Sequence, residues 1–159
     1  MKVILPGSYD PVTKGHLEII KRAAEAYDEV FVVAFINPSK KYRFSVEDRV
    51  RMLALATDEL DNVIVSYSTG LVVDYMREHG IEKIIKGYRT EADLSWEREQ
   101  AEWNLSHGGY ETELWRCESG FEAISSTAVR DALDGGDDGT VSALVPESVL
   151  RYIKEIENR

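Results

Sequence analysis

The chain has 159 residues, of which 43% are hydrophobic and 30% charged, with a formal net charge of −10 at pH 7. This size fits one soluble cytoplasmic domain over residues 1–159, and no apolar run approaches the roughly 18 residues that cross a bilayer. The acidic balance argues against nucleic-acid binding, and the single cysteine, Cys117, excludes an internal disulfide and fits a reducing compartment.

Apolar, β-branched runs alternate along the chain with segments of helical period. Strands are predicted over 2–5, 29–36, 62–67, 83–86 and 112–117. Helices are predicted over 15–27, 46–59, 72–79, 92–106, 126–134 and 147–157. Strict alternation with short connections indicates an α/β fold with a doubly wound parallel sheet of five strands. Ligands bind such sheets beyond the carboxyl ends of the strands, where the winding reverses.

One stretch between these elements is rich in glycine and aspartate. Residues 133–140, LDGGDDGT, are predicted to form a mobile, solvated loop whose acidic side chains do no chemistry.

The segment PGSYDPVTKGH, residues 6–16, follows the first predicted strand. Gly7 lets the backbone come close to a ligand, and Ser8 offers a hydroxyl beside free amide groups. The following helix begins near Gly15 and His16, so its free N–H groups and positive dipole end create a phosphate site. The helix end also lowers the pKa of His16, which is expected to be neutral and to donate to a phosphoryl oxygen. The alternative is that His16 merely caps the helix.

Two further loops at strand ends carry cations. An anionic ligand needs such a local basic cluster, because the protein as a whole is negatively charged. The two loops contain Lys40, Lys41 and Arg43 in NPSKKYRFS, residues 37–45, and Lys86 and Arg89 in KGYR, residues 86–89. Arginine grips a phosphate with a planar fork, whereas lysine offers a compact charge. The alternative for the first of these loops is a solvated charge run.

A fourth loop carries hydroxyls. Ser125, Ser126 and Thr127 open a predicted helix, so they form a second anion cradle or, alternatively, a simple serine N-cap. The chain has no GxxxxGK[ST] loop, no GxGxxG, no HExxH and no GxSxG elbow. The four loops together therefore favour phosphoryl chemistry without a covalent nucleophile, which depends on positioning and charge neutralisation.

Four segments resemble those of phosphopantetheine adenylyltransferases, a family of nucleotidylyltransferases in bacterial coenzyme A synthesis. PGSYDPVTKGH resembles the family's PG[ST]FDPxTxGH, and PSKK followed by Phe44 resembles PxKKxxF. KGYRTEADLSWE resembles [RK]G[LIY]RxxxDFEYE, and ISSTAVR resembles ISSSxVR. The resemblance implies a Rossmann-like nucleotidylyltransferase fold and transfer of AMP from ATP to 4′-phosphopantetheine by direct in-line attack. It also implies a homohexamer in the cytoplasm.

The resemblance also implies a role for each matching residue. The catalytic residues would be His16, Lys40 and Arg89. The ATP-binding residues would be Ser8, Tyr9, His16, Gly87, Tyr88, Arg89, Glu97, Phe121, Glu122, Ala123, Ile124, Ser125, Ser126 and Thr127. The acceptor would bind Ser8, Lys40, Val72 and Lys86. No metal ligand is expected, because Mg²⁺ would be carried mainly by the ATP phosphates, with Asp10 as a possible outer-shell partner.

The sequence departs from the family's pattern near the expected acceptor. Lys86 replaces the commoner arginine, Trp96 stands where a tyrosine is usual, and Arg116 occupies a normally apolar position. Trp96 and Trp103 lie seven residues apart and share a helix face, which favours packing in the core or between subunits. Two alternatives remain: adenylylation of nicotinic acid mononucleotide, although Thr13 stands where that family has a histidine, and a catalytically inactive nucleotide-binding regulator.

Overall fold

The computed structural model describes residues 1–159 and contains one sheet of five parallel strands. The strands are β1 (Lys2–Gly7), β2 (Glu29–Phe35), β3 (Val63–Ser68), β4 (Lys83–Tyr88) and β5 (Glu111–Arg116). The helices are α1 (Lys14–Ala26), α2 (Val46–Ala56), α3 (Val72–His79), α4 (Glu91–Gly108), α5 (Ser126–Asp134), α6 (Asp138–Leu144) and α7 (Glu147–Glu157). No helix combines the length and the apolar character that crossing a membrane requires.

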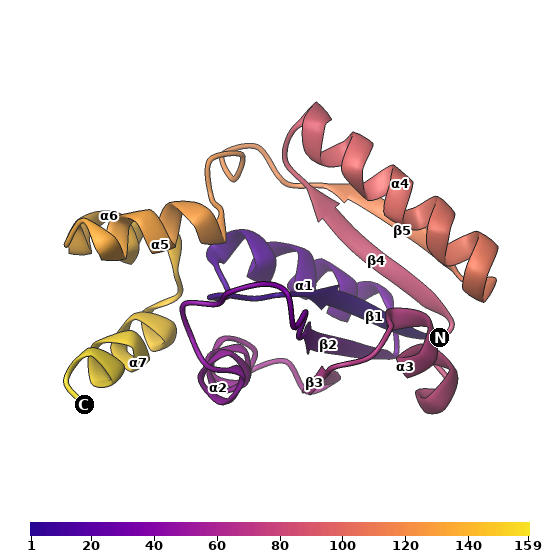
Figure 1. The fold of residues 1–159 in the computed structure, drawn as a ribbon, viewed down its shortest axis with the longest axis horizontal. Helices are drawn as coiled ribbons and strands as arrows, with labels where there is room; N and C mark the ends of the chain where they lie inside the picture. The colour runs from indigo at the N-terminus through magenta and orange to yellow at the C-terminus, as the bar shows by residue number, and fades with distance from the viewer.

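The sheet has the strand order β3-β2-β1-β4-β5, with every neighbouring pair parallel. The chain therefore winds outward from β1 through β2 to β3, returns to the middle at β4 and ends at the opposite edge with β5 (Figure 1). This confirms the predicted doubly wound sheet. The winding reverses between β1 and β4, so the carboxyl ends of these two strands mark the expected ligand site.

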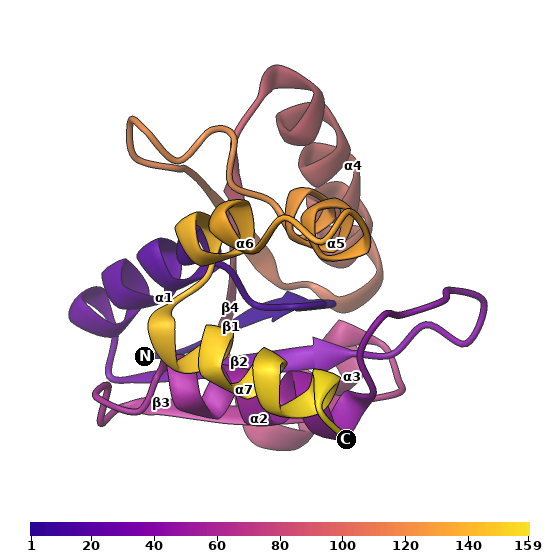
Figure 2. The ribbon, with the colours of Figure 1, turned by 90° about the vertical axis from the view of Figure 1, so that its left-hand side faces the viewer.

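Successive side chains of each strand point to opposite faces of the sheet, and helices cover the apolar side chains on both faces. On one face, Val3, Leu5 and Val32 pack with apolar residues of α1, α2 and α5 to α7. On the other face, Ile4 and Ile84 pack with residues of α3. Helix α4 lies beside α3 against β4 and β5 (Figures 1 and 2). The result is a three-layer arrangement with the sheet in the middle.

The prediction of a loop over residues 133–140 is wrong in its second half. Helix α5 continues to Asp134, and after Gly135 and Gly136 helix α6 begins at Asp138. The side chain of Asp137 caps α6 by accepting from the N–H of Thr140. A glycine pair therefore separates two helices, and only the short turn between them is loop.

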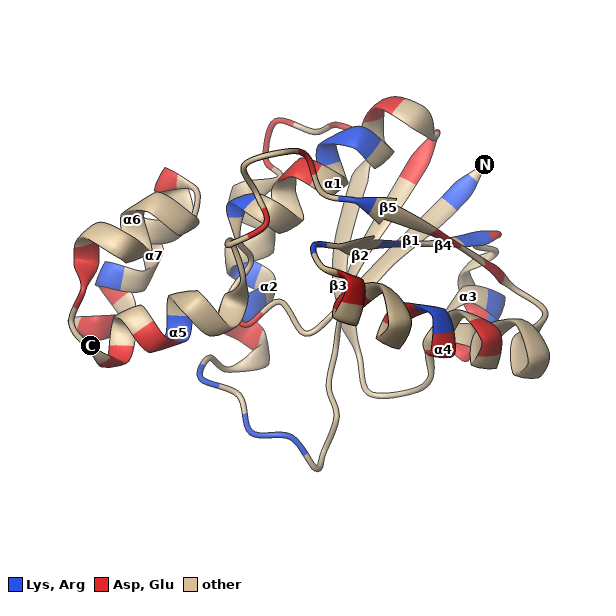
Figure 3. Cartoon of the chain, turned by 90° about the horizontal axis from the view of Figure 1, so that it is seen from above, with Lys and Arg blue, Asp and Glu red and all other residues tan.

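The β2–α2 connection, residues 36–45, reaches away from the body of the protein (Figure 2). Asp10 fixes the end of the connection that leads into α2: its two carboxylate oxygens accept the N–H groups of Arg43 and Phe44 at 2.9 Å each. Figure 3 shows basic segments along this connection, whereas acidic segments gather on α4 and near the chain's carboxyl end. The charged residues of this connection are therefore all basic, although other cations are spread over the molecule.

Candidate active site

Two adjacent cavities open at the carboxyl ends of β1 and β4. The first cavity has a volume of about 350 Å³ and is lined by residues from the loops after β1, β4 and β5 together with the starts of α1 and α5. The second cavity has a volume of about 620 Å³ and lies between the β2–α2 connection, the start of α3 and one side of α4. The switch point of the sheet thus holds two spaces rather than one.

The two cavities share a wall. The residues that line both are Pro6, Gly7, Ser8, Lys40, Lys86, Trp96 and Glu97. Two of these side chains, Lys40 and Lys86, are cations, and Ser8 adds a hydroxyl from the loop after β1. A group placed in either cavity can therefore meet the same two positive charges.

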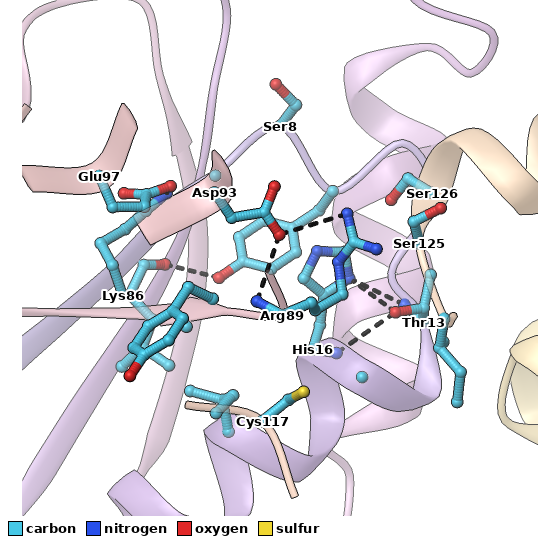
Figure 4. Close-up of a pocket in the computed structure, with 18 of the residues that line it drawn as sticks. Ser8, Thr13, His16, Lys86, Arg89, Asp93, Glu97, Cys117, Ser125 and Ser126 are labelled. Atoms are coloured by element: carbon cyan, nitrogen blue, oxygen red, sulfur yellow. Dashed lines mark hydrogen bonds and ion pairs between the residues drawn. The ribbon is translucent and has the colours of Figure 1, made fainter. Parts of the chain in front are cut away.

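His16 lies in the first cavity at the amino end of α1 (Figure 4). Its Nδ1 accepts the backbone N–H of Thr13 at 3.0 Å, while the Thr13 hydroxyl accepts the N–H of His16 at 3.3 Å. This reciprocal pair is a capping box, so His16 does take part in capping the helix, while its role toward a ligand stays a prediction. Because the Thr13 amide can only donate, Nδ1 must be the unprotonated nitrogen and Nε2 carries the proton. Capping therefore leaves one ring N–H free to donate.

The charge state of His16 follows from its surroundings. Burial, together with the nearby cations of Lys86 and Arg89, lowers the pKa of His16 to about 4. The predicted direction is confirmed, but the main cause is burial of the ring rather than the helix end. At neutral pH His16 is an uncharged hydrogen-bond donor.

This lowered pKa makes the stability of the protein depend on pH. Between pH 6.5 and 4 the unfolded chain binds a proton at His16 that the folded chain does not, so stability falls as the pH falls. We expect the free energy of unfolding, measured with urea, to drop between pH 7 and pH 5 by about 2 kcal/mol more in the wild type than in His16→Gln. Glutamine at this position keeps a capping box. Equal losses in the two proteins would contradict the assigned charge state.

Lys40 and Lys86 both belong to the shared wall and contact residues at or just after the end of β1. The Nζ of Lys40 donates to the Ser8 hydroxyl at 3.1 Å, and the Nζ of Lys86 donates to the Pro6 carbonyl at 3.2 Å. Lys86 also lies 3.6 Å from Oε1 of Glu97, whose pKa is raised by burial although Lys86 opposes the shift. Both lysines thus point at the residues that end β1.

Arg89 lines the first cavity but not the second, so it is not part of the shared wall. Its Nη1 donates to the Glu122 carbonyl at 3.0 Å, and its Nη2 lies 3.5 Å from Asp93 (Figure 4). His16 and Arg89 both line the first cavity. The guanidinium is therefore anchored by the loop after β5 while it faces the cavity.

The amino ends of α1 and α5 meet at the floor of this cavity. A Cβ added to Gly15 would lie 3.4 Å from the Ile124 carbonyl, so the two helix starts are in contact. Ser125 caps α5 by accepting from Ala128, as the alternative prediction held, and the Ser126 hydroxyl donates to the Pro11 carbonyl at 2.7 Å. The free N–H groups of two helix ends consequently face one space, where an anion binds well.

The structure brings most of the predicted site residues together. The first cavity is lined by Ser8, Tyr9, His16, Lys40, Lys86, Gly87, Tyr88, Arg89, Glu97, Phe121, Ile124, Ser125, Ser126 and Thr127. Val72 lines the second cavity. Glu122 and Ala123 line neither: both are exposed, and the Glu122 carboxylate accepts the N–H of Gly120. Tyr9 is buried, with its hydroxyl donating to Leu5, so little of it is free for a ligand.

Two residues of the site were assigned differently or missed. Asp10 lines the first cavity, but its carboxylate is taken by two backbone amides of the β2–α2 connection. Arg130, which was not predicted, also lines this cavity and donates to the Asp10 carbonyl at 2.9 Å. Its position three residues after Thr127, one turn into α5, was the available signal.

Trp96 and Trp103 were expected to pack in the core or between subunits; packing in the core is wrong, and packing between subunits stays a prediction. Their side chains are 59% and 41% exposed, and Leu94 is the one buried residue of α4. Trp96 instead forms part of the shared wall, whereas Trp103 stacks on His107 outside both cavities.

A doubly wound sheet whose switch point holds two adjacent cavities, lined by helix amino ends and basic side chains, fits a nucleotidyltransferase class of protein. The family of cytidylyltransferase-like proteins matches residues 4–132 of this chain. A phosphopantetheine adenylyltransferase from Clostridium novyi (strain NT) is 39% identical over 151 residues, which cover 94% of this chain and 92% of that protein. The chain therefore belongs to the phosphopantetheine adenylyltransferase family of cytidylyltransferase-like proteins.

Proposed function

We propose that the protein transfers AMP from ATP to the phosphate of 4′-phosphopantetheine, forming dephospho-coenzyme A and pyrophosphate. The observation that carries this proposal is the wall of Ser8, Lys40 and Lys86 between two cavities. A transfer between two phosphate-bearing substrates needs two spaces whose phosphates meet at one point, with cations there to offset their repulsion. Family membership and the relative's name support the same activity.

The proposed reaction is one in-line displacement. An oxygen of the acceptor phosphate attacks the α-phosphorus of ATP, and the bond from that phosphorus to the oxygen bridging to the β-phosphate breaks. The electron pair leaves with pyrophosphate, so no proton has to move. Catalysis then depends on holding the two phosphates in line and on stabilising the charge of the transition state.

ATP is proposed to occupy the first cavity. The free Nε2–H of His16 would donate to an oxygen of the α-phosphate, which gains charge as the bond to the leaving group breaks. Arg89 and the amino end of α5 would hold the β- and γ-phosphates. A neutral donor suits this role because it keeps its hydrogen bond throughout the reaction without needing to titrate.

The acceptor is proposed to occupy the second cavity. Its phosphate would lie at the shared wall between Lys40 and Lys86, and its pantetheine arm would run past Val72 along α4. This cavity is the larger of the two and mixes apolar residues with amides such as Gln100 and Asn104, which suits an extended ligand that carries amide groups.

Mg²⁺ is proposed to enter as part of the ATP substrate. The carboxylates in the first cavity already have partners: Asp10 binds two amides, Asp93 binds Arg89, and Glu97 lies near Lys86. No three His, Cys, Asp or Glu side chains are grouped to hold a metal. The donor set therefore fits an ion bound by phosphates and water, and the rate should follow the concentration of the Mg²⁺–ATP complex.

The acceptor is tested by measuring pyrophosphate release from ATP and Mg²⁺ with 4′-phosphopantetheine, with nicotinic acid mononucleotide and with no acceptor. We expect rapid release of pyrophosphate only in the mixture that contains 4′-phosphopantetheine as the acceptor. Release with nicotinic acid mononucleotide would assign the rival activity, and ATP binding without release in any mixture would identify a regulator.

The position of Trp96 provides a binding readout. Since Trp96 lines both cavities while Trp103 and Trp115 line neither, ATP should change the fluorescence of this one tryptophan. We expect Trp96→Phe to lose most of the fluorescence change that ATP causes and Trp103→Phe to keep it. The opposite pattern would place the nucleotide elsewhere.

The assembly and location of the protein are proposed from the resemblance. We propose a homohexamer in the cytoplasm. Apolar side chains of Ile64, Tyr67 and Leu71 are exposed along β3 and the turn after it, which suits a contact between copies. Sedimentation velocity would measure the assembly state.

A further inference from the structure

Arg49 in α2 is a buried arginine that has no acidic partner. Its exposed fraction is 2%, and none of the ion pairs of the protein includes it. Its Nη1 donates to the Ser8 carbonyl at 2.9 Å, and its Cζ lies 3.9 Å from the centroid of the Tyr42 ring. The Nε is buried and donates to nothing. A guanidinium is costly to bury without a carboxylate, so its contacts to Ser8 and Tyr42 need an explanation.

Those two contacts lead to the shared wall. Ser8 is held at two atoms: its carbonyl accepts from Arg49, and its hydroxyl accepts from Lys40 at 3.1 Å. The Nζ of Lys40 also lies 5.6 Å from the centroid of the same Tyr42 ring. Ser8, Lys40, Tyr42 and Arg49 therefore form one connected group, which we call the Arg49 cluster.

The members of the Arg49 cluster have different access to ligands. Ser8 and Lys40 line both cavities, Tyr42 lines the second cavity, and Arg49 lines neither. Arg49 is therefore placed behind the wall, where it supports the groups that face the phosphates. Lys40 is otherwise an exposed side chain on a protruding connection, and none of the ion pairs includes it.

We infer that Arg49 is a positioning residue for the acceptor phosphate: it fixes the Ser8 carbonyl and the Tyr42 ring, and through them the place of Lys40. This inference rests on the proposed function. One guanidinium can donate to a carbonyl while its plane lies over an aromatic ring, a combination that an ammonium group does not reproduce. Its uncompensated charge also adds to the attraction of the wall for phosphate.

The test is the steady-state kinetics of pyrophosphate release by Arg49→Met and Arg49→Lys. For Arg49→Met we expect kcat/KM for 4′-phosphopantetheine to fall about 10- to 100-fold, because small displacements at a reacting centre have effects of this size. The KM for ATP should change less than about threefold, since Arg89 and the helix ends, which hold the triphosphate, are untouched. Arg49→Lys keeps the charge but not the geometry, so its kcat/KM for 4′-phosphopantetheine should lie between the values of Arg49→Met and the wild type.

Two further variants separate positioning from general stability. Arg51→Met changes an exposed arginine on the same helix and should leave both kinetic constants unchanged. Tyr42→Leu removes the ring that both Arg49 and Lys40 contact. It should lower kcat/KM for 4′-phosphopantetheine in the same way as Arg49→Met. The melting temperature of each variant shows how much protein is folded in the assay.

Three outcomes are distinguishable. A selective loss in kcat/KM for the acceptor by folded Arg49→Met supports the inference. Kinetic constants equal to the wild type's, or equal losses for both substrates that follow the fraction of folded protein, overturn it. A wild type that releases no pyrophosphate with any acceptor overturns the proposed function itself, and the inference with it.

Discussion

Replacing His16 with alanine should lower kcat for pyrophosphate release about 100- to 1,000-fold. The free Nε2–H of His16 is the proposed donor to the α-phosphate in the transition state, and losing one such donor costs about 2.7–4 kcal/mol. ATP binding should weaken much less, because Arg89 and two helix ends remain in the first cavity. The measurement is kcat at saturating substrates, together with the dissociation constant of ATP from Trp96 fluorescence.

The stability of His16→Ala has to be separated from its chemistry. Alanine leaves the Thr13 amide without its acceptor, and loss of a capping group costs about 0.5–2 kcal/mol. His16→Gln keeps the acceptor, so it should regain stability without regaining the rate. His107→Ala, at an exposed position on α4, is the matched control and should behave as the wild type. A folded His16→Ala with an unchanged kcat would refute the role of the imidazole.

Replacing Lys86 with methionine should lower kcat/KM for the acceptor about 10- to 150-fold. Hydrogen bonds to charged groups are worth about 1.5–3 kcal/mol, and Lys86 lies in the wall that both substrates share. The loss also leaves Glu97 near the phosphates without its cation. Exposed Lys154→Met on α7 is the matched control, and steady-state kinetics with each substrate varied measures the effect.

The pH profile of Lys86→Met is a sharper test of the same wall. Burial raises the pKa of Glu97 and Lys86 opposes that shift, so removing Lys86 should raise the pKa further. Protonation then removes a negative charge that repels the substrates, so the ratio of the activity of Lys86→Met to that of the wild type should rise as the pH is lowered. Lys86→Met/Glu97→Gln should lack this rise and be more active than Lys86→Met at pH 8. A ratio for the single variant that does not change with pH would show that Glu97 does not act at the wall.

The order of the elements could be predicted because local patterns determine it. Alternating apolar runs and helical segments were enough to expect a doubly wound parallel sheet, whereas the reversal of the winding between β1 and β4 was seen only in the structure. Helix α6 was missed because its glycine-rich start looks like a loop. The capping aspartate at position 137 and the buried Val141 and Val145 were the signals against a loop.

The site residues could be predicted only where the sequence pattern around each residue points to its role. Lys86 lies near the end of β4, Arg89 and Lys40 lie in loops that follow strands, and His16 lies in the first turn of the helix after β1, so the sheet brings all four together. Arg49 had no such signal, because its sequence neighbours are those of an ordinary amphipathic helix. Its role depends on Ser8, which is 41 residues away in the chain. Similarly, the spacing of Trp96 and Trp103 predicted a shared face of α4, but whether that face is covered depends on how α4 lies against the sheet.

The most direct test of two substrates meeting at one wall is a crystal structure with 4′-phosphopantetheine and an ATP analogue whose α,β-bridging oxygen is a methylene group. We expect the α-phosphorus beside Nε2 of His16, with an acceptor phosphate oxygen about 3–3.5 Å from it, between Lys40 and Lys86. Triphosphate density away from His16 and Arg89, or an acceptor phosphate outside the shared wall, would contradict the account.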